Sequence, residues 1–381
     1  MKESKETKIR VALMSDVIDR RPERTKVGRY LAEYLLSRPE IELYLIHYDK
    51  MPDDPLYDRV HEVIIPRVNF IFGSKFLSFI KFCLTTNLRF DIVHWLVARP
   101  YPFFWFFPSK KFVVTAHDGG SILAPGMFTL PNFFFNLTMR WFNGHIDAVT
   151  GASEFGSRQI VYAYHIHPEK VFTAYVAQDP IYRPLPREEV DLVLNRYNLF
   201  FQEYFLYVGG LQTHKNVGAV VGGYDIYRDF ELGIEKLVLI SNPSYDAPKV
   251  FEKIKKAKHG GDVIHFKYVD IKDMPAIYNG AKALVFTSLN EGFGLPLAEA
   301  MACGVPIVAS RRSVIAEVTD GAAVFVDPLS DESVANGIRK VSQDKKLRDD
   351  LIKKGLTRAA YFSWEKFGEA VVSMYDRILQ S

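Results

Sequence analysis

The stretch Asn290–Ser310, NEGFGLPLAEAMACGVPIVAS, holds the pattern that decides the fold. It follows the apolar run Ala283–Thr287, which we interpret as a buried strand. Gly292 and Gly294 lack a Cβ, so the backbone of this segment can approach a ligand closely, and Pro296 suits the first position of a helix. The stretch therefore predicts a strand, a glycine-bearing loop and a short helix.

This loop is expected at the carboxyl end of a strand, where open α/β sheets bind ligands. The N–H groups and the positive end of the following helix suit a phosphate. Glu291 lies before the helix and Glu299 is expected in its first turn. A carboxylate can accept hydrogen bonds from two neighbouring hydroxyls, so one glutamate could hold a ribose and the other a sugar ring. The alternative is that both acids only cap or solvate the helix.

The length of 381 residues exceeds one ordinary core and favours two domains of about 150 to 200 residues. Short apolar runs alternate with helix-length segments, and the pattern restarts after the proline-bearing stretch Asp179–Pro186. The expected strands are Ile9–Met14, Glu42–Ile46, Val63–Pro66, Ile92–Trp95, Phe112–Ala116 and Ala148–Gly151, then Phe205–Val208, Leu237–Ile240, Val263–Phe266, Ala283–Thr287, Pro306–Ala309 and Ala323–Val326.

We therefore predict an α/β protein made of two Rossmann-like lobes with the active site in the cleft between them. The expected domains are residues 1–183 and 184–362. Residues 363–381 are expected to form a C-terminal helix that crosses back to the first domain, with Ser363 as its cap.

Composition excludes several other classes of protein. The formal charge of +3 is nearly balanced, which argues against a strongly basic nucleic-acid-binding body. The two cysteines, Cys83 and Cys303, are too few for a disulfide framework or a cysteine metal site. No run has the length and apolarity of a signal peptide core or a membrane-spanning helix, so we expect a cytoplasmic protein.

The stretch from Glu291 to Ser310 resembles the E-x7-E signature of the retaining GT-B glycosyltransferases of family four, also called glycosyl transferases group 1. The resemblance continues at Tyr268–Asp270 (Y-V-D), at Ala322–Pro328 (A-A-V-F-V-D-P) and at Phe362–Glu365 (F-S-W-E). It is close in the C-terminal half and patchy in the N-terminal half. It implies a first domain that binds the acceptor and a second domain that binds a nucleotide sugar.

The resemblance also implies roles for individual residues. Glu299 is implied to hydrogen-bond the donor ribose, and Glu291 to contact the transferred sugar. Backbone groups are implied to face the sugar, the diphosphate or the base. These donor-binding positions are Gly28, Gly210, Val269, Gly292, Phe293, Gly294 and Leu295.

The segment Tyr207–Asn216, YVGGLQTHKN, follows another expected strand. By the same resemblance Lys215 neutralises the donor diphosphate, a role that suits a point charge. A solvated surface lysine is the alternative. Gly210 stands where many members carry an arginine, so either Lys215 and the helix end suffice or another cation, such as Arg311 or Arg312, serves.

His117 ends the expected strand Phe112–Ala116, in a stretch similar to the T-x-H-D element of the family. A histidine there could donate a proton to the leaving phosphate or a hydrogen bond to a sugar hydroxyl, and a structural histidine is the alternative. With Glu291 and Lys215 it completes the expected catalytic set. No D-x-D motif or H-E-x-x-H spacing occurs, so we expect no metal, and no cofactor besides a GDP- or UDP-linked sugar as co-substrate.

The acceptor is the least determined part. Segments Phe70–Leu84 and Met127–Phe142 interleave aromatic residues with lysine or arginine, which suits an anionic membrane surface and a lipid-linked acceptor. The alternative is that both pack on the sheet. The run Tyr101–Phe107, YPFFWFF, fits neither description and could line the cleft. We expect a metal-independent retaining hexosyltransferase of surface polysaccharide or glycolipid assembly, at the inner face of the cell membrane. A soluble acceptor, or nucleotide-sugar binding without catalysis, is the alternative.

Overall fold

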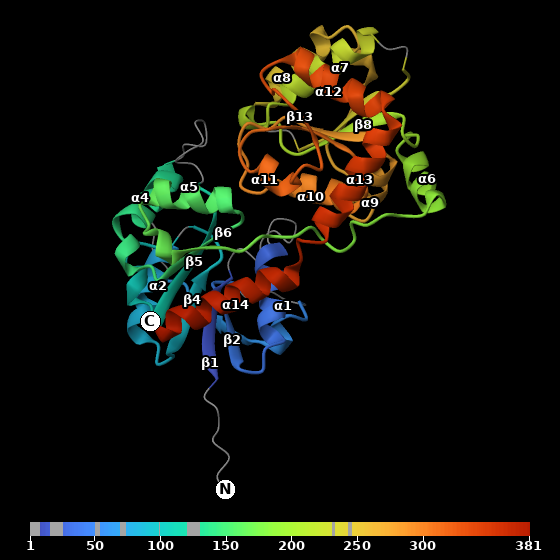
Figure 1. Ribbon diagram of the computed structural model, residues 1–381. Helices are drawn as coiled ribbons and strands as arrows, with labels where there is room; N and C mark the ends of the chain where they lie inside the picture. The colour runs from blue at the N-terminus through green and yellow to red at the C-terminus, as the bar shows by residue number, and fades with distance from the viewer. Residues whose placement is uncertain are drawn as a thin grey trace. The chain divides into compact units, whose positions relative to one another are not determined.

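The computed structural model describes residues 8–15, 26–49, 54–68, 74–98, 100–119, 130–230, 233–242 and 246–381. The chain forms two compact units: unit 1 is residues 1–176 with Trp364–Ser381, and unit 2 is Ala177–Ser363. Each unit is built on one parallel sheet with helices around it (Figure 1). The two sheets confirm the predicted α/β class. The units divide after Val176, whereas we expected the division after residue 183.

The sheet of unit 1 has seven parallel strands in the order β3-β2-β1-β4-β5-β6-β7. The central strands are apolar runs whose side chains are buried on both faces, as parallel sheets covered by helices require. The strands are β1 Ile9–Met14, β2 Ile41–His47, β3 His61–Ile64, β4 Phe90–Trp95, β5 Ser109–His117, β6 Ala148–Gly151 and β7 Val171–Thr173. The sequence did not predict β7, because this edge strand has three half-buried residues and no apolar run.

Among the described residues, the helices of unit 1 are α1 Lys26–Leu36, α2 Ser74–Thr85, α4 Leu130–Trp141, α5 Glu154–Tyr164 and α14 Trp364–Gln380. The described residues of unit 1 also include the short 3-10 helices η1 Tyr57–Arg59, η2 Phe104–Phe106, η3 Asn143–His145 and η4 Pro168–Lys170. Ser153 is the N-cap of α5, and its hydroxyl oxygen accepts the Gly156 N–H at 2.9 Å, a common way to start a helix.

Aromatic side chains make up much of the core of unit 1. On α2, Phe79 and Phe82 are buried against Phe107, so the packing interpretation holds for this helix. Ser78, between the lysines of this helix, is buried and accepts the Val68 N–H at 2.8 Å, because the helix turns this residue toward the preceding loop. In the YPFFWFF run, Phe104 and Phe107 are core residues and do not line a cleft. Residues 70–73 and 127–129 of the two aromatic segments lie outside the described residues.

The C-terminal helix α14 belongs to unit 1, as the sequence predicts, and packs against α1 (Figure 1). The ring of Trp364 stacks on Tyr30 with centroids 4.3 Å apart. One turn later, Gly368 lies against the ring of Tyr34, where a Cβ would collide with it. The first turns of α14 therefore fit α1 closely.

A buried polar network joins α14 to the centre of the sheet. The fully buried His94 of β4 lies 2.6 Å from the Tyr375 hydroxyl of α14 through Nδ1. Its Nε2 lies 2.8 Å from Thr115 Oγ1, which also accepts from Thr150 Oγ1 at 3.0 Å. Burial lowers the pKa of His94 to about 3, with a smaller effect from nearby His117. His94 is therefore neutral, with one ring nitrogen donating and the other accepting.

Unit 2 has six parallel strands in the order β10-β9-β8-β11-β12-β13. The strands are β8 Tyr204–Val208, β9 Lys236–Ile240, β10 Val263–Phe266, β11 Ala283–Phe286, β12 Ile307–Ser310 and β13 Val324–Val326. The helices are α6 Arg187–Arg196, α7 Val217–Phe230, α8 Ala247–Lys256, α9 Met274–Gly280, α10 Leu295–Ala302, α11 Ile315–Thr319, α12 Asp331–Gln343 and α13 Lys345–Ala359, with η5 Thr213–Lys215 and η6 Gly260–Asp262.

The strand order of unit 2 reverses between β8 and β11. From β8 the chain adds β9 and β10 on one side, and then returns to add β11, β12 and β13 on the other. The carboxyl ends of β8 and β11 therefore form a topological switch point, where loops diverge and ligands bind in open sheets. The two loops that the sequence singled out follow these two strands. Within the described ranges, no helix is both long and apolar enough to cross a membrane.

We predict that His94 makes unit 1 less stable as the pH falls below about 6.5. In the unfolded chain the imidazole takes up a proton near its usual pKa of about 6.5, whereas in the folded chain it stays neutral down to a pKa of about 3. Between about pH 3 and pH 6.5 the unfolded state binds more protons than the folded state. The free energy of unfolding therefore falls by about 1.4 kcal/mol for each unit by which the pH is lowered in this range. Above about pH 6.5 it does not depend on His94.

Thermal unfolding midpoints measured between about pH 4 and pH 8 check this slope. His94→Gln should flatten the dependence relative to the native chain, and His167→Gln, whose side chain is 67% exposed, should leave it unchanged. An equal slope in the His94 variant would contradict the assignment.

Candidate functional site

The loops that follow β8 and β11 are joined to each other by several hydrogen bonds. The Leu289 N–H donates to the His214 carbonyl at 2.8 Å, and Ser288 Oγ donates to the same oxygen at 3.2 Å. Asn216 Nδ2 donates to the carbonyls of Thr287 at 3.3 Å and Pro328 at 2.7 Å. Asn216 takes a left-handed conformation, with φ of 53°, to end η5 and start α7. The two loops therefore form one structural body at the switch point.

Lys215 and Glu291 form an ion pair across these loops. Lys215 Nζ lies 2.8 Å from Oε1 and 2.7 Å from Oε2 of Glu291. The Glu291 side chain is 8% exposed and that of Lys215 is 22% exposed, so solvent screens the pair only in part. The sequence predicted both residues for the site but not their pairing. The contact balances the buried carboxylate and fixes both side chains at the ends of β8 and β11.

Ser313 supports Glu291 from the segment after β12. The Glu291 N–H donates to Ser313 Oγ at 3.0 Å, and that hydroxyl donates to the Glu291 carbonyl at 2.9 Å. The Ser313 backbone has a left-handed conformation, with φ of 59°. This conformation directs the Ser313 side chain back toward the loop that carries Glu291. Arg311 and Arg312, the alternative cations, are exposed on this segment, and the Arg311 guanidinium lies 5.2 Å from the ring centroid of Phe325. Sequence reasoning missed Ser313, because nothing local distinguishes it from an ordinary loop serine.

The glycine-bearing loop turns into α10 at Gly294. This residue is the N-cap, with φ of 87°, so the helix begins at Leu295, one residue before the expected start. Glu299 is consequently the fifth helical residue and not part of the first turn. Gly292 is half-buried, and the Phe293 ring is 5% exposed and packs edge-on against Phe362 with centroids 5.1 Å apart. The Phe293 ring belongs to the core, so only its backbone suits a ligand.

Glu299 has a defined partner inside unit 2. Its Oε2 accepts a hydrogen bond from the Tyr278 hydroxyl at 2.7 Å, and Tyr278 is fully buried on α9. Glu299 itself is half-buried. Val269, expected near the nucleobase, lies in the loop between β10 and α9 with its side chain buried.

Gly210, where many members of the resembling family carry arginine, lies in a packed part of the loop after β8. The Tyr207 hydroxyl donates to the Gly210 carbonyl at 2.6 Å. A Cβ on Gly210 would collide with the amide group of Gln212. An arginine here would displace the end of the Gln212 side chain, a flexible group that can move aside, so packing does not by itself require glycine at this position.

His117 and Gly28 belong to unit 1. His117 ends β5 in a left-handed conformation, with φ of 61°, at a register shift between β5 and β6. Its carbonyl accepts the Ala152 N–H at 2.9 Å, and burial lowers the pKa of its imidazole while Asp118 opposes the shift. The imidazole is therefore neutral near pH 7. Gly28, named among the donor-binding positions, is the third residue of α1 and is buried.

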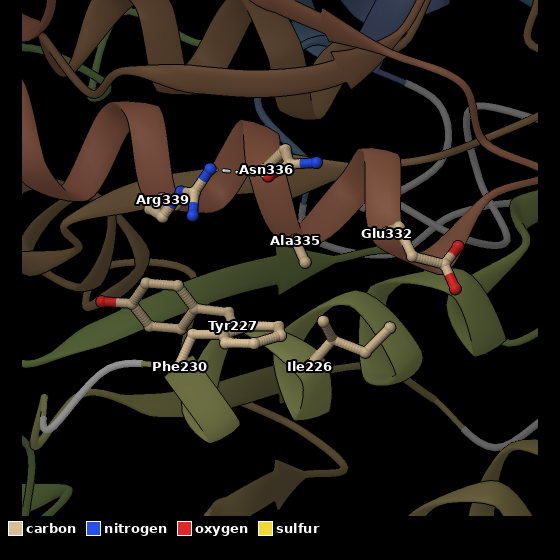
Figure 2. Close-up of a pocket in the computed structure, with 7 residues that line it drawn as sticks. All are labelled: Ile226, Tyr227, Phe230, Glu332, Ala335, Asn336 and Arg339. Atoms are coloured by element: carbon tan, nitrogen blue, oxygen red, sulfur yellow. Dashed lines mark hydrogen bonds between the residues drawn. The ribbon is translucent and has the colours of Figure 1, made fainter.

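A hollow of about 270 Å³ lies elsewhere in unit 2, between α7 and α12 (Figure 2). Its lining from α7 lies in the last part of that helix, whereas Lys215 precedes the helix start. The lining residues are Ile226, Tyr227, Phe230, Glu332, Ala335, Asn336 and Arg339, none of which is an expected site residue. Within the described residues, no group of three or more His, Cys, Asp and Glu side chains is placed to hold a metal ion.

Residues 201–358 match the family model described as Glycosyl transferases group 1. Unit 2 carries a group 1 glycosyltransferase domain. The matched range contains every donor-binding residue expected in this unit, from Gly210 to Glu299. The family resemblance stated from the sequence is therefore confirmed.

Individual proteins that are similar to this chain are glycosyltransferases or share its fold. O-antigen chain mannosyltransferase B of Escherichia coli is 28% identical over 273 residues, which cover 70% of each chain. Serotype-specific mannosyltransferase WbdA of Escherichia coli is 24% identical over 251 residues, which cover 62% of this chain but 29% of that one. The structure of Alr3699/HepE from Anabaena, solved with UDP and glucose, has a TM-score of 0.72 at 14% identity, over 97% of this chain and 100% of that one. The last likeness shows the fold alone, and that fold is GT-B.

We predict that Gly294→Ala destabilises the glycosyltransferase domain by about 1–3 kcal/mol. The left-handed φ of 87° is strained for any residue with a Cβ, and the new Cβ would lie 3.0 Å from Leu297 Cδ1. Denaturant midpoints at an unchanged slope measure the loss. Gly261→Ala is the matched control in the same unit, since its Cβ would meet nothing within 4 Å. Equal midpoints for the two variants would contradict the strain argument.

Proposed function

We propose that the protein is a retaining, metal-independent hexosyltransferase that uses a nucleotide diphosphate sugar and elongates a surface polysaccharide. One observation supports this most: the Lys215–Glu291 pair, the glycine-capped start of α10 and Glu299 all lie in the group 1 domain, around the switch point of its sheet. Together they offer positive charge for phosphates and carboxylates for sugar hydroxyls.

The positive charge at this site suits a diphosphate. Helix starts present N–H groups and a partial positive charge, which favour a bound phosphate. The Lys215 ammonium has three N–H donors, and its two contacts to Glu291 leave capacity for a phosphate oxygen. Lys215 can therefore contact the diphosphate and keep Glu291 in place. In this assignment Glu291 accepts from hydroxyls of the transferred sugar and Glu299 from those of the ribose.

The chemistry follows from the charges. Breaking the bond between the anomeric carbon and the diphosphate oxygen leaves positive charge on the sugar and negative charge on the departing oxygen. Preorganised donors at Lys215 and the α10 start stabilise that negative charge, so the reaction has no need of a metal clamp. The acceptor hydroxyl attacks from the same face, and its proton passes to the departing phosphate. We retain His117 as a catalytic residue, since its neutral imidazole can donate one N–H.

The relatives suggest the substrates. The two curated relatives are named as O-antigen or serotype-specific mannosyltransferases, so we propose mannose as the transferred hexose and a glycan as the acceptor. Alr3699/HepE was solved with UDP, and both GDP and UDP therefore belong in a donor screen.

We predict that Lys215→Met and Glu291→Gln each lower kcat/KM for hexose transfer by about 100-fold or more, because each removes charge at the reacting groups. The measurement is transfer from GDP-mannose or a UDP-hexose to a mannosylated acceptor in the presence of EDTA, with the anomer of the product read by NMR. Lys253→Met is the matched control, since it breaks another ion pair of unit 2, to Asp331 at 2.7 Å. Full activity in the Lys215 variant would refute the role of Lys215. Loss of transfer activity in EDTA would refute metal independence, and a product with the inverted anomeric configuration would refute the retaining mechanism.

We also propose that unit 1 touches an anionic lipid surface through the exposed aromatic side chains of Phe103, Phe106 and Trp141. Phe106 is 54% exposed and Trp141 is 68% exposed. Phe103 and Phe106 stack with centroids 5.9 Å apart, and Trp105 between them packs on Phe142, the neighbour of Trp141. The exposed Arg140 lies beside Trp141 in the chain. Exposed aromatics with a basic neighbour suit an interface of lipid headgroups.

We predict that the native chain co-sediments with vesicles that contain anionic lipid and not with neutral vesicles. Replacing Phe106 and Trp141 together by serine should lower the bound fraction several-fold, because both side chains lose their burial in the interface. Phe230→Ser, which removes a 74% exposed ring from unit 2, should leave binding unchanged. A native chain that stays in the supernatant would favour a soluble acceptor.

A further inference from the structure

We infer that Tyr278 is a positioning residue, which orients the Glu299 carboxylate for the donor ribose and so gives the site its preference for ribose over deoxyribose. The inference rests on the ribose-binding role proposed for Glu299. The starting observation is the hydrogen bond of 2.7 Å from the Tyr278 hydroxyl to Glu299 Oε2. A hydroxyl that donates to a carboxylate at this distance forms one of the stronger protein hydrogen bonds.

Tyr278 is held rigidly. It lies on the short helix α9, where six of the seven residues are buried. Its ring is fully buried and meets the ring of Tyr182 edge-on, with centroids 5.6 Å apart. Its hydroxyl therefore has a fixed position, from which the carboxylate of a longer, more flexible side chain can be aligned.

A second phenol borders the same carboxylate. Tyr182 is 7% exposed, and burial raises the pKa of its hydroxyl, with the nearby Glu299 as the next largest cause. The chain around Tyr182 is tied to α9: the Leu185 N–H donates to Asn279 Oδ1 at 3.0 Å, and Asn279 Nδ2 donates to the Arg183 carbonyl at 2.9 Å. Glu299 is therefore bordered by two tyrosines that share one supporting helix.

A fixed carboxylate matters for ligand discrimination. Glutamate has three rotatable side-chain bonds, and ordering them on binding costs free energy that a preorganised side chain does not lose. A carboxylate can accept about four hydrogen bonds, so the bond from Tyr278 is compatible with further bonds from two ribose hydroxyls. A site built to bind hydroxyls rejects analogues that lack them, because its polar groups then lose their partners. Loosening Glu299 should weaken this rejection.

Tyr204 provides a matched control. It too is a buried tyrosine whose hydroxyl donates to α9, to the Ile277 carbonyl at 2.5 Å, the residue before Tyr278. Tyr204→Phe and Tyr278→Phe therefore each remove one buried hydroxyl bonded at α9. Only the second removes a bond to Glu299.

The test measures dissociation constants of GDP and UDP and of their 2′,3′-dideoxy forms by calorimetry, and takes the ratio of dideoxy to ribose form. The native chain should show a large ratio for its preferred nucleotide. We expect Tyr278→Phe to lower this ratio by about tenfold, as loss of one hydrogen bond to a charged group implies. Tyr204→Phe should leave the ratio within about twofold of native.

Glu299→Ala separates the two levels of the inference. If Glu299→Ala lowers the ratio and Tyr278→Phe does not, the positioning role is refuted and the ribose role stands. If Glu299→Ala leaves the ratio unchanged, the ribose role itself is refuted, and the positioning role with it. Should Tyr278→Phe fail to fold, a crystal structure of the native chain with GDP or UDP decides. Ribose hydroxyls on Glu299 with the Tyr278 bond retained support the inference, and a broken Tyr278 bond overturns it.

Discussion

The parallel pairing of β8 with β11 is the constraint on which the candidate site depends. Because these strands are neighbours in the sheet but far apart in the chain, the loops that follow them leave the sheet together. Lys215 and Glu291 come from these two loops and meet at 2.7 Å, although 76 residues separate them in the chain. The pair exists only in the folded sheet, and it places a cation and a carboxylate where the chain also starts α10. Local sequence supplies the residues, and strand order brings them together.

This division explains what could be predicted from the sequence. The buried strands are apolar runs, and Gly292, Gly294 and Pro296 mark the loop and helix start, so local composition was enough to place them. The partner of a side chain is a different matter. The contacts of Glu291 with Ser313 and of Glu299 with Tyr278 join residues about twenty positions apart through intervening strands or helices, and depend on strand register and helix rotation. The buried Ser78 of α2 shows the same limit, because a neighbouring loop decided its environment.

Position 210, where many members of the family carry arginine, is a glycine in this chain. The Tyr207 hydroxyl donates to the Gly210 carbonyl, and the end of the flexible Gln212 side chain occupies the space where a Cβ would lie. Lys215 is the cation that this loop presents, and its pairing with Glu291 holds it at the switch point. A positive charge that is already held in position costs less reorganisation when a phosphate arrives than a flexible arginine would.

Residues near both ends of unit 2 contact side chains that belong to α10 or lie next to it. At the entry, Tyr182 meets Tyr278, which in turn bonds Glu299. At the exit, Phe362 packs edge-on against Phe293, which precedes the α10 cap. Close packing transmits displacement, because buried rings cannot move without their neighbours. A displacement of the α10 start would therefore be felt at Phe362, and one of Glu299 at Tyr278 and Tyr182. The residues that would hold the nucleotide are thus in contact with side chains near both ends of unit 2.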